Sequence, residues 1–239
     1  MRPVNKGNCP QHSDGNDIVF SFHQDARGML IERLGQYCSY CEMKLDSALA
    51  VEHVQPKQPE GSLTVIKERE VSWDNFLLAC PNCNSTKGRL DVVLDDYLWP
   101  HIDNTFLALR YSEGGMVSVS DQLSCEMKKK ADNTIRLTGL HKNPFNDQQK
   151  SDRRSENRRK VWDIACEAKT DLALNQTEQM RRSIVNVAKG HAYWSVWMTV
   201  FKDDPDMCKR LINAFPGTCS DCFDERNAYS PIQRSPGQI

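Results

Sequence analysis

The chain has 239 residues, of which 39% are hydrophobic and 26% charged, a composition typical of a globular protein that buries a core of ordinary size. No apolar run approaches the roughly eighteen residues that span a bilayer, and the polar opening MRPVNKGNCPQHSDGND has no apolar centre of a signal peptide. We therefore expect no membrane span, no export and a cytoplasmic location.

The net charge and the cysteine content limit the classes of function that fit this chain. The formal net charge is −1, the first 140 residues summing to −4 and the rest to +3. A protein that grips nucleic acid by charge alone is expected to be more basic, so action on nucleic acid needs a local basic patch, a metal or a partner. Ten cysteines in a chain without an export signal point to metal binding rather than to disulfides.

The first third of the chain predicts one helix, one strand and a second, shorter helix. After a polar lead-in over 1–20, helical spacing of apolar residues predicts a helix over 21–35, with Gly35 as its C-cap. LAVEHV at 49–54 predicts a short strand, followed by a loop through residue 70. A tight turn then carries two cysteines, and a short helix is expected to begin near Asn84.

The pattern changes towards the C-terminus. Residues 105–120 alternate and turn at Gly114 and Gly115, which predicts a β-hairpin. Beyond about residue 150, apolar residues recur at helical spacing, among them Val161, Ile164, Ala165, Ala168, Leu172, Ile184, Val187 and Ala188. The segment HKNPFNDQQKSD, between Leu140 and Asp152, is the predicted boundary between the two regions.

Two cysteine pairs carry the clearest chemical signal. Cys38 and Cys41 form one C-x-x-C pair, and Cys80 and Cys83 form a second one 38 residues later. Two such knuckles complete a tetrahedral Cys₄ zinc site, which is closed and therefore structural, and which would anchor residues 42–79 at both ends. Four unrelated buried thiols are the alternative, and a redox role lacks the βαβ context that it needs.

The segment around these pairs resembles the HNH endonuclease family, in the version flanked by two zinc-binding cysteine pairs. The matching elements are YCSYC, VEHVQPK, WDNFLLAC and CNSTKG, in that order, over about residues 37–88. The resemblance implies two short antiparallel strands followed by a helix, clasping one metal ion against the scissile phosphate of a nucleic acid.

The same resemblance implies roles for single residues. His53 is the general base, Asn75 holds it in position, and Glu52 binds the catalytic metal. Asn84 stands where the family usually has its last histidine, as in relatives that use asparagine as a metal ligand. A carboxylate and an amide oxygen favour Mg²⁺ or Mn²⁺ over Zn²⁺ or Ni²⁺. Lys87 is a candidate phosphate contact.

Each of these residues also has a plain structural interpretation. Glu52 and His53 can form a solvated pair at a strand end, Asn75 a turn, Asn84 a helix N-cap and Lys87 a solvated helix lysine. Two further residues of the segment LWPHIDN can extend the site. They are His101 and Asp103.

The C-terminal region offers two further features. The run QKSDRRSENRRKVW is either a solvated helix start or a face that contacts phosphate or a partner, and its basic residues are Lys150, Arg153, Arg154, Arg158, Arg159 and Lys160. An aromatic run is expected to be core, and its members are Tyr193, Trp194, Trp197, Met198 and Phe201.

A third C-x-x-C pair raises the question of a second metal. Cys219 and Cys222 form the pair, with Cys208 upstream, and a fourth ligand would have to come from His191 or Cys125. No fourth ligand has diagnostic spacing, so the sequence leaves a second zinc site open.

These features predict an α+β protein: a zinc-stabilised ββα-metal nuclease module with a mostly α-helical C-terminal region. We divide it into an N-terminal lead and helix (1–36), the HNH core with its zinc site (37–90), a β-hairpin extension (91–140) and a helical region for partner or nucleic-acid docking (141–239). The expected activity is Mg²⁺- or Mn²⁺-dependent cleavage of DNA.

Two alternative functions and one possible partner remain. The substrate can be RNA, tRNA for example, or the chain can be a non-catalytic zinc module that binds nucleic acid or a partner protein. The order of lead, HNH centre and helical tail also resembles the HNH effectors of Septu-like bacterial antiphage systems, the PtuB group. That resemblance implies an ABC-type ATPase as partner.

Overall fold

The computed structural model describes residues 1–143 and 152–239. Lys150 and most of the predicted boundary segment fall outside these residues. The division into four parts therefore stays a prediction.

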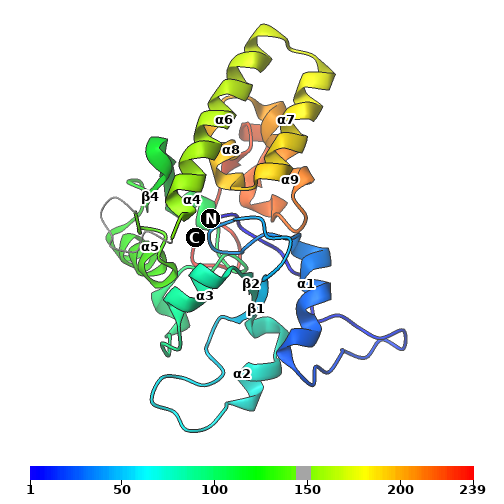
Figure 1. The fold of residues 1–239 in the computed structure, drawn as a ribbon, viewed down its shortest axis with the longest axis vertical. Helices are drawn as coiled ribbons and strands as arrows, with labels where there is room; N and C mark the ends of the chain where they lie inside the picture. The colour runs from blue at the N-terminus through cyan, green and yellow to red at the C-terminus, as the bar shows by residue number, and fades with distance from the viewer. Residues whose placement is uncertain (144–151) are drawn as a thin grey trace.

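A small ββα unit lies at the centre of the N-terminal half (Figure 1). Strand β1 (Ala50–His53) pairs antiparallel with β2 (Phe76–Ala79), His53 opposite Phe76, and helix α3 (Pro81–Lys87) follows directly. Every residue of β2 is buried, because its apolar side chains face the core on both sides. The predicted strand is confirmed and the α+β class holds.

The helix after the second cysteine pair begins earlier than the sequence indicated. Pro81 occupies the first turn, where its missing N–H would have no helical partner, and Cys80 is the N-cap, its Sγ accepting from Cys83 N at 3.4 Å. The interpretation of Asn84 as an N-cap is therefore wrong: its side chain lies in the second turn, on the flank of the helix.

Two helices flank this unit in the N-terminal third. A 3₁₀ turn, η1 (His23–Ala26), continues into α1 (Arg27–Leu34), which ends at Gly35 with φ of 75°, so the predicted helix and its C-cap are confirmed. The stretch predicted as loop, through residue 70, contains most of α2 (Lys67–Val71), and η2 (Trp73–Asn75) follows it. Helix α2 buries none of its side chains, so no apolar periodicity marked it in the sequence.

The middle of the chain forms a hairpin and a helix. The hairpin joins β3 (Leu109–Ser112) and β4 (Met116–Val119) through η4 (Glu113–Gly115), as predicted, although residues 105–108 are helical. A Cβ at Gly115 would lie 2.1 Å from Ser155 O, so glycine is required where the turn meets α6. The other elements here are η3 (Leu94–Asp96), α4 (Thr105–Ala108) and α5 (Cys125–Thr138).

The C-terminal region is mostly helical, as expected. Its elements are α6 (Arg154–Leu174), α7 (Glu178–His191), α8 (Trp194–Val200), α9 (Pro205–Ala214), η5 (Ser220–Cys222), β5 (Phe223–Asp224), η6 (Glu225–Asn227) and β6 (Ser230–Pro231). Helices α6 and α7 run side by side at one end of the molecule, and β1, β2 and α2 lie towards the other (Figure 1). The predicted aromatic core is confirmed, since Tyr193, Trp194, Trp197, Met198 and Phe201 are all buried.

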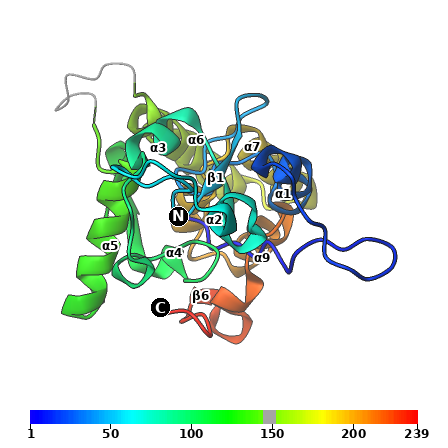
Figure 2. The same cartoon turned by 90° about the horizontal axis from the view of Figure 1, so that it is seen from below.

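Seen from below, α5 lies on one flank of the molecule and α1 on the opposite flank (Figure 2). The ββα unit is therefore supported from both sides. None of the helices within residues 1–143 and 152–239 combines the length and apolar character that a bilayer crossing requires.

Candidate functional site

The two cysteine pairs meet in one buried cluster. Cys38 and Cys41 come from the turn before β1, and Cys80 and Cys83 from the start of α3. Their sulfur atoms lie within 4.8 Å of one another, Cys41 Sγ and Cys80 Sγ being 3.6 Å apart. Four thiolates at Zn–S bonds of about 2.3 Å give sulfur separations of about 3.8 Å, so the cluster fits tetrahedral zinc.

Four buried cysteines can all be thiolates only if a positive charge balances them. Burial raises the pKa of the Cys41 and Cys83 thiols well above the usual value. Two C-x-x-C knuckles that converge without a cation would leave buried thiols in mutual contact. A zinc ion would hold all four as thiolates and would close the loop between residues 41 and 80.

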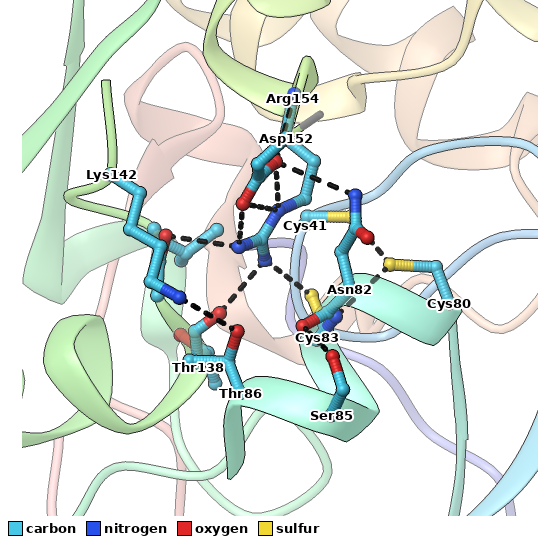
Figure 3. A network of polar contacts seen from close by, with 12 residues as sticks. Cys41, Cys80, Asn82, Cys83, Ser85, Thr86, Thr138, Lys142, Asp152 and Arg154 are labelled. Carbon is cyan, nitrogen blue, oxygen red and sulfur yellow. Dashed lines mark hydrogen bonds and ion pairs between the residues drawn. The ribbon is translucent and has the colours of Figure 1, made fainter. Parts of the chain in front are cut away.

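An arginine from the C-terminal region completes the surroundings of the cluster (Figure 3). Arg154 Nη1 lies 2.9 Å from Cys83 Sγ and donates to Thr138 O at 2.8 Å, while Nη2 reaches Gly139 O at 3.1 Å. Asp152 holds the guanidinium from the other side, with Nη2–Oδ2 at 2.6 Å. The side chain of Arg154 is 2% exposed, so α6 brings a buried cation to the zinc-binding sulfurs.

This contact revises the interpretation of the basic run. Arg154 and Arg158 are buried, and Arg158 donates to Gly115 O and Leu140 O. These two arginines therefore bind backbone carbonyls and a cysteine sulfur, and they do not form a solvated or phosphate-contacting face. Arg159 and Lys160 remain at the surface, paired with acidic residues of their own helix.

The third cysteine pair does not gather a ligand set. Within the described residues, the four-cysteine cluster is the one group of three or more candidate ligands close enough to share an ion. Cys208 donates to Phe201 O at 3.3 Å inside the helical core, and Cys125 is exposed at the start of α5. The second zinc site that the sequence left open is therefore not formed.

Four of the five residues predicted for the catalytic site line one cavity. It measures about 230 Å³ and its walls come from η1, β1, the loop after β1 and α3. Its lining residues are His23, Val51, Glu52, His53, Pro56, Lys57, Gln58, Asn84, Lys87, Gly88 and Arg89. Four of the predicted residues thus meet here, on the flank of α3 next to its zinc-binding start.

Glu52 and Lys87 form a buried ion pair at this cavity. Lys87 Nζ lies 2.9 Å from Glu52 Oε1 and donates to His53 O at 2.8 Å, and the two side chains are 1% and 5% exposed. The Lys87 ammonium is the charge partner of this buried oxygen, which has no other donor within the described chain. Burial raises the pKa of Glu52, and Lys87 opposes that rise.

His53 is held as a neutral base. Its Nε2 lies 3.0 Å from Glu70 O, and a carbonyl oxygen only accepts, so the ring proton sits on Nε2 and the Nδ1 lone pair is free. Burial lowers the pKa of His53 to about 4. At neutral pH the ring is therefore uncharged and able to accept a proton at Nδ1.

Asn75 acts on the backbone beside His53 rather than on the ring. Its Oδ1 accepts from Gln55 N at 2.7 Å, and its Nδ2 donates to Gln55 O and to Arg69 O, both at 2.8 Å. These bonds fix the turn after β1 and the end of α2, whose next carbonyl, that of Glu70, holds the His53 ring. Asn75 lies outside the cavity lining.

The structure adds one residue that the sequence did not single out. The His23 ring lies 4.7 Å from the His53 ring, centroid to centroid, and lines the same cavity. Burial and the nearby Lys57 lower the pKa of His23. A lone histidine 30 positions before His53 carries no motif signal, and only the packing of η1 against β1 brings the two rings together.

His101 and Asp103 do not join this group. Asp103 is fully buried and accepts from Trp99 N and Gln238 N, both at 2.7 Å, so it fixes backbone turns. His101 lines a separate cavity of about 600 Å³, on the side of Asn75 that faces residues 5–8.

The oxygen donors at the cavity are of the kind that binds a hard divalent cation. Glu52 presents a buried carboxylate oxygen without a hydrogen-bond donor, and the Asn84 side chain has no hydrogen-bond partner among the residues that the structure describes. Carboxylate and amide oxygens are the donors that Mg²⁺ and Mn²⁺ prefer. The Lys87 ammonium, however, already neutralises this carboxylate.

Comparison with known families agrees with this geometry. Residues 38–90 match the family model HNH endonuclease. None of the curated proteins matches the chain. The match and the four-cysteine cluster fit a zinc-binding HNH domain, which supports a nuclease that acts on nucleic acid and uses a divalent metal.

Proposed function

We propose that this protein is a metal-dependent endonuclease that hydrolyses phosphodiester bonds in DNA. The observation that carries the proposal is the meeting of Glu52, His53 and Asn84 around one cavity beside the cysteine cluster, inside the HNH match. A base and a cation are the minimum that hydrolysis of a phosphodiester needs.

In this proposal each residue has one task. His53 Nδ1 takes a proton from the attacking water, and the Glu70 carbonyl holds the ring in the tautomer that leaves Nδ1 free. Glu52 and Asn84 hold Mg²⁺ or Mn²⁺, which when bound stabilises the charge that develops on the phosphate and the departing oxygen. Asn75 positions His53 through the backbone of Gln55 and Arg69.

The cysteine cluster has a different task. Zinc held by Cys38, Cys41, Cys80 and Cys83 is closed to water, so it fixes the start of α3 and takes no part in the chemistry. Because α3 carries Asn84 and Lys87 one turn further on, the zinc also fixes the position of one wall of the cavity.

The decisive experiment compares zinc-loaded wild type and His53→Ala on plasmid DNA in Mg²⁺. We expect the variant to lose roughly 10²- to 10⁴-fold in rate, the usual contribution of a general base, while it keeps its zinc. Retained cleavage would remove His53 from the mechanism, and no cleavage by wild type with any divalent metal would favour the non-catalytic zinc module.

Substrate and partner belong to the same proposal. We favour DNA over RNA, and parallel assays on DNA, RNA and tRNA decide between them, because the cavity residues do not distinguish the sugars. The order of elements and the modest net charge of −1 support a Septu-like, PtuB-type antiphage effector in the cytoplasm, whose ABC-type ATPase partner supplies much of the grip on DNA. Co-purification of an ATPase encoded beside this gene tests that part.

A further inference from the structure

The Glu52–Lys87 pair lies where the proposed catalytic metal has to bind. We propose that Lys87 is a built-in counter-ion that a divalent ion displaces from Glu52, and that the released ammonium then contacts a phosphate of the nucleic acid. Lys87 would thereby couple metal binding to substrate binding. The inference rests on the proposed function, since it concerns the metal ligand Glu52.

The geometry makes Lys87 a specific partner of the catalytic pair. Its ammonium contacts the Glu52 carboxylate at 2.9 Å and the His53 carbonyl at 2.8 Å, so one cation links two adjacent residues of β1. Two long side chains at a solvated surface gain little from such a contact, but here both are almost fully buried.

The Lys87 ammonium and a divalent metal ion would compete for the same carboxylate, that of Glu52. Among the residues that the structure describes, Glu52 is the one carboxylate that lines the cavity, and its negative charge balances the Lys87 ammonium. A divalent ion bound to the same carboxylate would lie within a few ångströms of that ammonium, in a site with little water to screen the repulsion. Binding of the metal therefore favours departure of the ammonium.

The position of Lys87 in α3 bears on where its ammonium can move. Lys87 is the last residue of α3 and is followed by Gly88 at φ of 59°, so it lies at the end of the helix, and its side chain lines the cavity. Asn84 lies three positions earlier, on the same face, so the metal and the departing ammonium share one wall. Lys57 and Arg89 line the same cavity; Lys57 is paired with Glu70 at 3.0 Å, and Arg89 donates to Gln58 O and Pro59 O while keeping its positive charge near the site of a phosphate.

Movement of the Lys87 ammonium from Glu52 to a phosphate would link metal binding to nucleic-acid binding. If phosphate binding draws Lys87 away from Glu52, nucleic acid raises the affinity for the metal, and the metal raises the affinity for nucleic acid by the same factor. Metal would then load preferentially when substrate is present. Without Lys87 the two binding events would lose this link.

The first test measures Mn²⁺ binding to zinc-loaded protein, by the electron paramagnetic resonance signal of free Mn²⁺. We compare wild type with Lys87→Met, Glu52→Gln and, as matched control, Lys142→Met. Lys142 lies beside α3, where it donates to Thr86 Oγ1 at 3.2 Å, and it is not among the residues that line the cavity. We expect Lys87→Met to bind Mn²⁺ about fivefold more tightly or better, the lower end of typical coupling between sites, with the control unchanged.

The second test keeps the native sequence, because Lys87→Met leaves Glu52 buried without a partner and can destabilise the fold. Reductive dimethylation followed by mass spectrometry measures how reactive each lysine is. We expect Mn²⁺ to raise the labelling rate of Lys87 several-fold and a short DNA duplex added with Mn²⁺ to lower it again, while Lys142 stays constant.

The outcomes separate the inference from the function beneath it. Mn²⁺ binding that is lost in Glu52→Gln, together with tighter binding in Lys87→Met or metal-induced labelling of Lys87, supports the proposal. If Mn²⁺ binding depends on Glu52, but Lys87→Met does not tighten it and Mn²⁺ does not raise the labelling of Lys87, the inference is overturned. The proposed nuclease site then stays in place. Binding that is indifferent to Glu52 overturns both.

Discussion

The cysteine cluster and the cavity share one short helix, α3. They differ in how firmly each holds the basic side chain that lies against its buried negative charge. At its start, Cys80 and Cys83 belong to a closed site of four sulfurs. One turn on, Asn84 and Lys87 belong to a cavity with oxygen donors. Each site has one basic side chain against its anion, Arg154 at 2.9 Å from Cys83 Sγ and Lys87 at 2.9 Å from Glu52 Oε1.

Arg154 has more partners than Lys87, and this matches the difference between a closed cluster and an open cavity. The planar guanidinium of Arg154 is fixed by Asp152, Thr138 O and Gly139 O, so it cannot leave the sulfurs without breaking several bonds. The compact ammonium of Lys87 contacts only Glu52 Oε1 and His53 O among the described residues, and its stem is flexible. A permanent counter-ion suits a structural metal, and an exchangeable one suits a metal that has to arrive with substrate.

The largest effect is expected at the closed site. Cys83→Ser, or removal of zinc by a strong chelator, should unfold α3 and the loop between the cysteine pairs, because structural zinc supplies about 10–16 kcal/mol of apparent folding free energy in small zinc modules. Zinc content and thermal unfolding by circular dichroism measure the loss. Cys166→Ser, at an exposed cysteine of α6, should change neither quantity.

The next effect tests whether Arg154 is a permanent part of the zinc site. Arg154→Met leaves Asp152 and the cysteine sulfurs without their buried cation, which should lower the free energy of unfolding by about 3–5 kcal/mol. Urea denaturation and the rate of zinc transfer to a chelator report it. Arg153→Met is the control, since Arg153 is 59% exposed and pairs only with Glu156 among the described residues. Equal stability of the two variants would contradict the role of Arg154.

A third change acts on the positioning of the base. Asn75→Ala removes three hydrogen bonds to the backbone of Gln55 and Arg69, and we expect kcat to fall roughly ten- to a hundredfold, as for residues that orient a catalytic group. KM and zinc content should change little. Asn133→Ala, which removes one bond to Asp96 O at the surface, provides the comparison. An intact kcat, with or without a rise in KM, would show that Asn75 does not position His53.

The contrast between the two sites also shows what the sequence could predict. Cysteine pairs, the Glu52–His53 neighbours and the spacing of Asn84 and Lys87 are local patterns. The structure brings the four cysteines together and places the other four residues around one cavity. Arg154 lies 71 positions from Cys83, so its contact depends on how α6 packs. The sequence showed an excess of arginine in this run, but periodicity does not show which arginine turns inward.

Two further features depend on packing that the sequence does not show. Lys87 was expected to face solvent or phosphate, yet the structure buries it because β1 places the Glu52 carboxylate within 2.9 Å of its ammonium. The predicted role of a phosphate contact remains a proposal that depends on its release. No helix is predicted over α5, because its sequence CEMKKKADNTIRLT is rich in charged residues near its start and only one face, including Ala131 and Ile135, is buried.

The smallest expected effect concerns the two imidazoles at the open site. Burial lowers the pKa of His53 to about 4, and the nearby His23 lowers it in the same direction. Since His53 works only when neutral, the cleavage rate of wild type should be flat near neutral pH and fall once the pH approaches about 4. His23→Ala opens the cavity and removes a group that is cationic at low pH, so the pKa of His53 should rise towards its usual value of about 6.5.

Histidine Cε1–H resonances followed against pH measure this pKa directly, and the rate–pH profile should show its falling limb at a higher pH in the variant. Gln24→Ala, at an exposed neighbour in η1, should leave both curves in place. A profile that stays unchanged in His23→Ala would mean that burial by the remaining walls alone keeps His53 neutral. A profile that moves would make His23 part of what prepares the base, which links the segment before the HNH match to the chemistry inside it.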